Sequence, residues 1–213
     1  MTVKNSPAEL SSALVNQRND VPLIRYSGRF APSPTGPLHF GSLITAVASY
    51  CDARAHQGRW LVRVEDTDIP RIYPGSEDHI LASLEAFQFD PDAEIIFQKD
   101  RLDIYESVLD QLKKEGLVYA CQCTRKMLGS NAIYAGTCRD LQLDFQHQAI
   151  RVKVQDQPIC FDDRLQGLHC SNLEHDLGDF VLKRRDGIIN YQLAVVVDDY
   201  LQGIRSEEHT SEL

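Results

Sequence analysis

The chain has 213 residues, a net charge of −9 at pH 7 and 43% hydrophobic residues, a composition typical of a globular protein and unlike that of a disordered or fibrous chain. No apolar run approaches the ~20 residues that cross a bilayer, and the N-terminus has no apolar signal core. The acidic balance excludes a uniformly basic nucleic-acid coat protein, although a local basic face can still bind phosphates. We therefore expect a cytoplasmic chain of one or two domains.

Strand and helix signals alternate along residues 25–118, after an N-terminal extension, 1–24, in which a short helix is expected over 7–16. Strands are expected at 25–31, 60–64 and 94–97, and helices at 39–56, 76–87 and 101–115. An order of strand, helix, strand, helix predicts a parallel α/β fold.

The second half of the chain has a different character. Residues 119–150 have little periodicity, and short strands are expected at 150–154, 159–162 and 179–184. The apolar run 194–197 is too short for periodicity to decide between strand and helix.

The apolar rhythm stops at Ile204, and the polar stretch RSEEHTSEL at 205–213 resembles the translated read-through of a sequencing-library adapter. We expect that this tail is not native and that the natural protein continues past Ile204. A solvated polar terminus is the alternative.

The segment RFAPSPTGPLHFGS at 29–42 leaves a strand, turns through prolines and glycine, and enters a helix. The first N–H groups of a helix have no partner within it, and the positive end of the dipole lies there, so such a turn can bind phosphate. His39 can donate a hydrogen bond to a phosphate oxygen, Gly41 lets a ligand approach the backbone, and Ser42 adds a hydroxyl. The alternative is a proline-rich surface turn with a capping histidine.

This string resembles the first signature of class I aminoacyl-tRNA synthetases of the glutamyl type, in which His-Phe-Gly-Ser is the local form of the HIGH motif. RVEDTD at 63–68 and DFVLKRRDGIINYQLAVVVDDYLQGI at 179–204 match the same group. The resemblance implies a Rossmann-like catalytic domain that uses ATP, with Mg²⁺ expected. The ATP-binding residues it implies are Pro32, Thr35, Gly36, His39, Gly41 and Ser42.

A pocket for glutamate needs a cation for the side-chain carboxylate and an anion for the ammonium. Arg29 offers a planar fork suited to a carboxylate, and Glu65 ends the next strand, at the sheet edge where open α/β sheets bind ligands. The resemblance implies glutamate contacts from Arg29, Phe30, Ala31, Pro32, Ser33, Glu65 and Tyr191. The alternative is a surface ion pair between Arg29 and Glu65.

The resemblance also implies a further glutamate-binding arginine and a KMSKS-like loop beyond Ile204, and neither is present in this chain. The lysine of that loop would stabilise charge in the transition state. We therefore expect this chain by itself to be a poor catalyst or an inactive one.

Six cysteines occur in the chain, at positions 51, 121, 123, 138, 160 and 170. Because the chain is expected to be cytoplasmic, metal ligation or free thiols are favoured over disulfides. Cys51 falls within a predicted helix and is expected in the core.

Cys121 and Cys123 can face one metal ion, and Cys138 returns from a loop to complete three thiolate ligands of a tetrahedral zinc site. Chemistry alone leaves the fourth ligand open between Tyr134 and His147, and three free thiols are the alternative. The pattern Cys-x-Cys, Tyr, x-x-x, Cys and the wording YQLAVVVDD at 191–199 resemble the glutamyl-queuosine tRNA(Asp) synthetases. That resemblance implies Tyr134 as the fourth ligand.

The same resemblance implies activation of L-glutamate with ATP without tRNA, followed by transfer to the queuosine base of tRNA(Asp). The expected organisation is a catalytic domain over 25–118, a zinc-bearing insertion over 119–178 and a return to the catalytic domain over 179–204, in a monomer. Three other functions stay open: an ordinary glutamyl-tRNA synthetase, a non-catalytic zinc-stabilised tRNA-binding module, and a small-molecule nucleotidyltransferase.

Overall fold

The computed structural model describes residues 26–128, 133–164, 166–204 and 206–207. The chain divides into two compact units, one formed by the residues up to Ser107 together with those from Leu193 onward, and the other by Val108–Gln192. The helix expected over 7–16 lies outside the described residues. No helix in the described ranges is long and apolar enough to cross a membrane.

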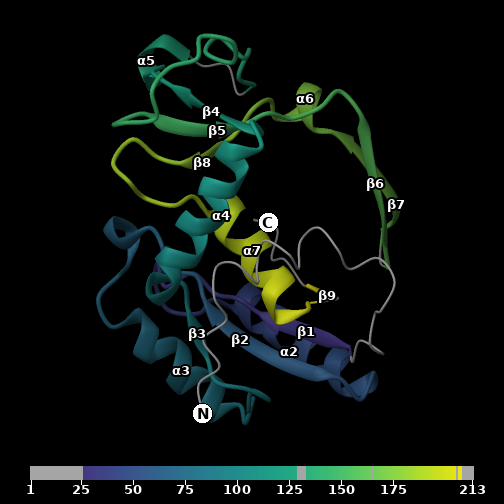
Figure 1. Ribbon diagram of the computed structural model, residues 1–213. Helices are drawn as coiled ribbons and strands as arrows, with labels where there is room; N and C mark the ends of the chain where they lie inside the picture. The colour runs from purple at the N-terminus through teal and green to yellow at the C-terminus, as the bar shows by residue number, and fades with distance from the viewer. Residues whose placement is uncertain (1–25, 129–132, 165, 205, 208–213) are drawn as a thin grey trace. The chain divides into compact units, whose positions relative to one another are not determined.

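A parallel sheet forms the centre of the first unit (Figure 1). Its strands are β1 (Ser27–Phe30), β2 (Arg59–Val64), β3 (Ile96–Phe97) and β9 (Ser206–Glu207), in the order β3-β2-β1-β9. All four residues of β1 and five of the six in β2 are buried, as is usual for parallel strands that are covered on both faces. The predicted parallel α/β fold is therefore confirmed.

The helical elements of this unit are α2 (Phe40–Ala55), the 3-10 turn η1 (Ile69–Arg71), α3 (Ser76–Ala86), the 3-10 turn η2 (Gln98–Arg101), and parts of α4 (Leu102–Lys114) and α7 (Tyr191–Gln202). The three helices predicted over 39–56, 76–87 and 101–115 are present as α2, α3 and α4, and the undecided run 194–197 lies in the helix α7. Small residues on α2 allow it to pack closely on the sheet, and Trp60 Nε1 donates to Ser49 Oγ at 2.9 Å. The core around them contains Phe30, Ala46, Ala53, Trp60, Val62, Ile80 and Leu84.

Cys51 lies on α2 but is exposed, so its expected place in the core is wrong. The buried positions on this helix include Ser49 and Ala53. Each residue of an α-helix is rotated by about 100° from the last, so Cys51 is about 200° from both of these neighbours. Its side chain therefore belongs to the opposite face of the helix.

The second unit contains an antiparallel sheet in the order β4-β5-β8, and a separate two-stranded hairpin formed by β6 and β7. The strands are β4 (Val118–Cys121), β5 (Ala149–Val152), β6 (Pro158–Asp163), β7 (Gly167–Asn172) and β8 (Val181–Lys183), with the short helices α5 (Arg125–Leu128) and α6 (Leu173–Asp176). The sequence prediction missed β4 and β7. All four residues of β4 are buried, and such a strand has no alternation for a periodicity argument to detect.

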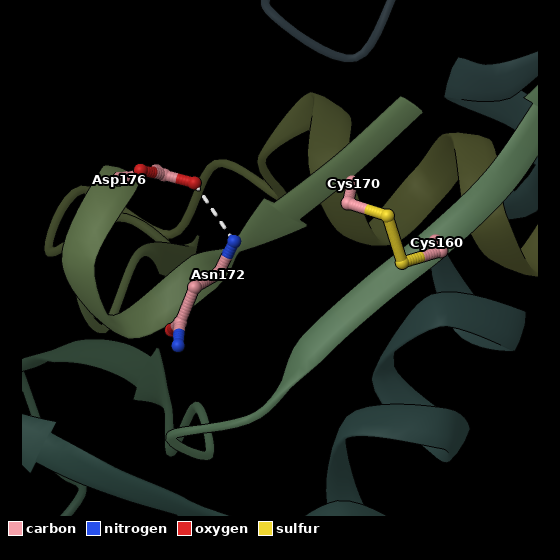
Figure 2. The surroundings of a disulfide bond; sticks show 4 residues. All are labelled: Cys160, Cys170, Asn172 and Asp176. Atoms are coloured by element: carbon pink, nitrogen blue, oxygen red, sulfur yellow. Dashed lines mark hydrogen bonds between the residues drawn. A yellow bond between two sulfur atoms is a disulfide. The ribbon is translucent and has the colours of Figure 1, made fainter. Parts of the chain in front are cut away.

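The hairpin contains a disulfide bond between Cys160 and Cys170, so the preference for free thiols or metal ligation is wrong for these two residues. The register of the hairpin places them directly opposite each other (Figure 2). At Asn172, the last residue of β7 and the N-cap of α6, the backbone N–H donates to Asp176 Oδ2 at 2.8 Å. The disulfide therefore joins neighbouring strands and does not link distant parts of the chain.

Candidate active site and candidate metal centre

The turn after β1 is fixed by hydrogen bonds from the residue that follows β2 and from the start of α3. Pro32 O accepts from Glu65 N at 2.9 Å, and Pro34 O accepts from Tyr73 N at 2.9 Å and from Ser76 Oγ at 2.6 Å. Pro32 and Pro34 are buried, whereas Ser33 and Thr35, which follow them, are exposed. A Cβ added at Gly36 would meet no atom within 4 Å. The turn thus presents two hydroxyls and an open backbone to solvent.

His39 is the N-cap of α2, and its Nδ1 accepts a hydrogen bond from Ser42 N at 3.2 Å. An imidazole that accepts at Nδ1 carries its proton at Nε2 when it is neutral. The side chain is exposed, and no acidic residue occurs in the first turn of the helix. The N-terminus of α2 therefore offers an Nε2–H donor and the positive end of a helix dipole to an anion.

Two buried arginines, near the C-terminal ends of β1 and β2, share one carboxylate. Arg29 donates to Asp199 from Nε at 2.8 Å and from Nη2 at 3.0 Å, and Arg63 Nη1 lies 2.7 Å from the same Asp199 Oδ1. A fork of two parallel bonds fixes the plane of a guanidinium as well as its position. Asp199 thus orients Arg29 on β1 and joins it to Arg63 on β2.

Glu65 follows β2, and its buried carboxylate accepts from Arg63 Nη2 at 3.1 Å. Burial is the largest influence on this group and raises its pKa, while Arg63 and Arg29 act in the opposite direction and Asp199 adds to the rise. A raised pKa means that burial destabilises the ionised form of the Glu65 carboxyl relative to its protonated form. A cation arriving beside Glu65 would offset part of that destabilisation.

Asp198, which precedes Asp199 in α7, anchors this helix in the first unit. Its fully buried carboxylate accepts from Gln98 Nε2 at 3.0 Å, from Arg101 Nε at 2.8 Å and from Tyr105 OH at 2.7 Å. Burial and this hydrogen bond raise the pKa of Tyr105, so its hydroxyl stays protonated as a donor. Because Asp198 is fixed, the adjacent Asp199 is held against Arg29.

Sequence reasoning identified Arg29 and Glu65 but missed Arg63, Asp198 and Asp199. The available signal was a charged residue inside the otherwise apolar run of β2, and a pair of acids at the end of an apolar run. Tyr191, another of the expected glutamate contacts, is the first residue of α7 and belongs to the second unit.

Three cysteines of the second unit converge beside a tyrosine. The sulfurs of Cys121, Cys123 and Cys138 all lie within 4.8 Å of one another, and Cys123 Sγ is 3.5 Å from Cys138 Sγ. The Tyr134 hydroxyl lies 3.4 Å from Cys121 Sγ and 3.7 Å from Cys123 Sγ, and accepts from Cys138 N at 2.9 Å. The four side chains thus surround one point.

These separations fit a tetrahedral ion. Zinc with Zn–S bonds of about 2.3 Å and a Zn–O bond of about 2.0 Å places two sulfurs about 3.8 Å apart, and a sulfur and an oxygen about 3.5 Å apart. His147 is exposed and is not among the clustered donors that could hold a metal in the described part of the chain. The geometry therefore favours Tyr134 over His147 as the fourth donor.

The surroundings shift the pKa values of Cys121 and Cys123 in opposite directions. Burial raises the pKa of Cys121, but bonds from Tyr134, from the Cys123 backbone and from Arg151 outweigh it, so the net shift is downward. The pKa of Cys123 is raised, with burial as the largest cause. The thiolate form is therefore favoured first at Cys121.

Residues 26–212 match the family described as tRNA synthetases class I (E and Q), catalytic domain. A glutamyl-Q tRNA(Asp) synthetase of Acinetobacter baylyi is 82% identical over 179 residues, covering 84% of this chain and 61% of that protein. One from Dechloromonas aromatica is 52% identical over 191 residues, covering 85% and 64%. The chain thus spans somewhat less than two thirds of these relatives.

Among solved structures, the chain resembles a glutamate tRNA ligase from Elizabethkingia meningosepticum in complex with its amino acid, with a TM-score of 0.76 and 30% identity, covering 86% of this chain and 43% of that one. A glutamate-tRNA synthetase from Elizabethkingia anophelis gives a TM-score of 0.75 at the same identity. The family match covers residues 26–212 and so includes the turn before α2 and the charged ends of β1 and β2. The chain belongs to the family of class I (E and Q) tRNA synthetase catalytic domains, which its residues 26–212 match.

Proposed function

We propose that the protein to which this chain belongs activates L-glutamate with ATP in the absence of tRNA, and then transfers the glutamyl group to the queuosine base of tRNA(Asp). The observation that carries this proposal is the 82% identity to a protein named glutamyl-Q tRNA(Asp) synthetase. The glutamate carboxylate attacks the α-phosphate of ATP, which gives glutamyl-adenylate and pyrophosphate. A hydroxyl of the queuosine ring then attacks the adenylate and releases AMP.

No side-chain nucleophile is needed in either step, so the protein contributes positioning and charge stabilisation. We assign Arg29 to the side-chain carboxylate of glutamate and Glu65 to its ammonium. Asp199 accepts from Nε and Nη2 of Arg29 and so fixes the plane of the guanidinium that we assign to the substrate carboxylate. An ammonium beside the buried Glu65 would lower the raised pKa of that carboxyl.

The phosphates of ATP would bind at the start of α2. His39 Nε2–H, the backbone around Gly36 and Gly41, and the hydroxyls of Ser42 and Thr35 are the groups we assign to them. The exposed position of His39 and its hydrogen bond from Ser42 N support this assignment. Mg²⁺, when bound with ATP, would neutralise part of the phosphate charge.

We further propose that Cys121, Cys123, Cys138 and Tyr134 hold one Zn²⁺. The separations among the four donors support this set. A closed site of this kind, with four protein ligands and no open position, would stabilise the fold and take no part in the chemistry.

The proposed activity is tested by glutamate-dependent exchange of pyrophosphate into ATP with no RNA present. The protein for this test has the full length of the relatives, of which this chain spans less than two thirds. Exchange without RNA is the expected result. Exchange that requires tRNA would favour an ordinary glutamyl-tRNA synthetase, the second candidate, which the similarity to two glutamate-tRNA ligase structures supports.

The glutamate pocket is tested by Arg29→Ala in the same protein. Removing one partner of a buried charge pair costs roughly 3–5 kcal/mol, more than a hundredfold in affinity, and we expect that loss for glutamate but not for ATP. Arg54→Ala is the matched control, because Arg54 pairs with Asp92 at the surface of the same unit. Equal losses of affinity for glutamate and ATP would contradict the assignment of Arg29 to the glutamate pocket.

A further inference from the structure

Arg151 is a buried cation beside the cysteine cluster. It lies in the interior of β5 with 8% of its surface exposed, and its Cζ is 3.8 Å from the centre of the Tyr134 ring. Its Nη1 donates to the backbone O of Asp179 at 2.5 Å. Its Nε is buried and has no hydrogen-bond partner within the described ranges.

The nearest acidic side chain is engaged elsewhere. The Asp179 carboxylate accepts from Tyr119 OH at 2.7 Å and from Val154 N at 2.9 Å, and lies 3.4 Å from Arg139 Nε. Among the described residues no carboxylate forms an ion pair with Arg151. A buried guanidinium whose neighbours, besides the Cys121 thiol, are a backbone carbonyl and an aromatic ring is costly unless a negative group faces it.

The cysteine cluster supplies that negative charge when it is loaded. Three thiolates around a divalent ion carry a net charge of −1, and an ionised tyrosine would make it −2. Arg151 contacts this group through the face of the Tyr134 ring. One buried cation beside a centre of charge −1 makes the pair neutral.

Tyr134 is held at three points. Its hydroxyl accepts from Cys138 N at 2.9 Å, its ring carries the Arg151 guanidinium, and its backbone packs on Gly178, where an added Cβ would lie 2.6 Å from Tyr134 O. Gly178 also has a φ of +70°, which favours glycine. The phenol oxygen is therefore directed at the sulfurs by its surroundings.

We propose that Arg151 is a positioning residue for the metal centre, which balances the charge of the thiolate-bound ion and fixes the Tyr134 ring so that its oxygen can complete the site. This inference rests on the proposed zinc site. It adds a residue outside the donor set whose charge and planar shape both contribute to metal affinity.

The experiment compares Arg151→Met, which removes the charge, Arg151→Lys, which keeps the charge but loses the planar stack, and Arg139→Met as the matched control. Arg139 contacts Asp179 as well but does not stack on Tyr134. Each full chain is assayed for zinc per chain, for zinc affinity against a chromophoric chelator, and for the visible spectrum of the Co²⁺-substituted form.

We expect Arg151→Met to lower zinc affinity by about 10–100-fold, Arg151→Lys to lose less affinity but to alter the Co²⁺ spectrum, and Arg139→Met to stay within about twofold. Wild-type affinity and spectrum in Arg151→Met would overturn the inference. Equal affinity losses in the Met and Lys variants would overturn the charge role. If Arg151→Met does not fold, Arg151→Lys decides, since an unchanged spectrum and affinity would exclude the stacking role. Absence of zinc from the unmodified chain would instead reject the proposed zinc site itself.

Discussion

The second unit contains two sets of cysteines that behave differently. Cys121, Cys123 and Cys138 converge beside Tyr134 with free thiols, and two of the three are buried. Cys160 and Cys170 are exposed and bonded to each other across two paired strands. The same residue type thus serves as a set of converging donors in one place and as a local covalent link in the other.

Placement, more than number, explains the difference. Cys121 ends a buried strand, and Cys123 follows two residues later, so both can face the same side, while Cys138 returns to them from a loop. Cys160 and Cys170 instead occupy directly opposite positions of an antiparallel pair, with Cα atoms 4.1 Å apart. Two cysteines in register bond to each other, whereas three that converge on one point are suited to share an ion.

The largest expected effect follows from removing one donor. Cys121→Ser should reduce zinc from one ion per chain to near zero and destabilise the second unit, because binding free energy at a structural zinc site is folding free energy, about 10–16 kcal/mol in zinc-finger peptides. Metal analysis and thermal unfolding measure both. Cys51→Ser, at an exposed free cysteine, is the control and should bind zinc normally. Full zinc in Cys121→Ser would return the cluster to free thiols.

A second expectation concerns pH. The ion displaces thiol protons, so affinity is greatest above the thiol pKa range and falls as the pH drops through it. The raised pKa of Cys123 extends the loss to higher pH, while the lowered pKa of Cys121 delays protonation of that thiol. Once all three are protonated, affinity should fall by up to about a thousandfold per pH unit. Chelator competition at a series of pH values measures this, and a flat profile would contradict thiolate ligation.

The fourth donor gives a smaller effect. Tyr134→Phe keeps the ring under Arg151 and removes only the hydroxyl, so we expect zinc affinity to fall by about 10–100-fold, a range typical of lost support around a metal. His147→Ala should leave affinity within about twofold, since His147 is exposed. The reverse ranking of these two variants would assign the fourth position to His147.

The smallest effect on the metal is expected from the disulfide. Cys160→Ser should leave zinc content unchanged and lower the free energy of opening the hairpin by about 3 kcal/mol, the loop-entropy value for cysteines ten residues apart. Hydrogen exchange of β6 and β7 amides measures the opening. Loss of zinc in this variant would mean that the two cysteine sets are coupled, which would break the contrast between them.

The sequence alone predicted the features that depend on neighbouring residues. The parallel α/β order of the first unit, the helix beginning after His39 and the grouping of Cys121, Cys123 and Cys138 all follow from spacing within short segments. Local periodicity and turn chemistry depend on only a few consecutive residues, so they can be recognised in the sequence alone. The assignment of Arg29 and Glu65 to glutamate came from the chemistry of the two side chains and from the family resemblance, and it stays a prediction.

Only the tertiary structure decided the features that depend on partners far along the chain. The helix containing residues 194–197 and the pairing of β4 with β5 required the distant segment to be in place. The bond from Arg63 to Gln202 and the bond from Arg151 to the backbone of Asp179 likewise join residues 139 and 28 positions apart. Long-range register and burial select these pairs, because a buried charge or strand is stable only once its partner has folded against it.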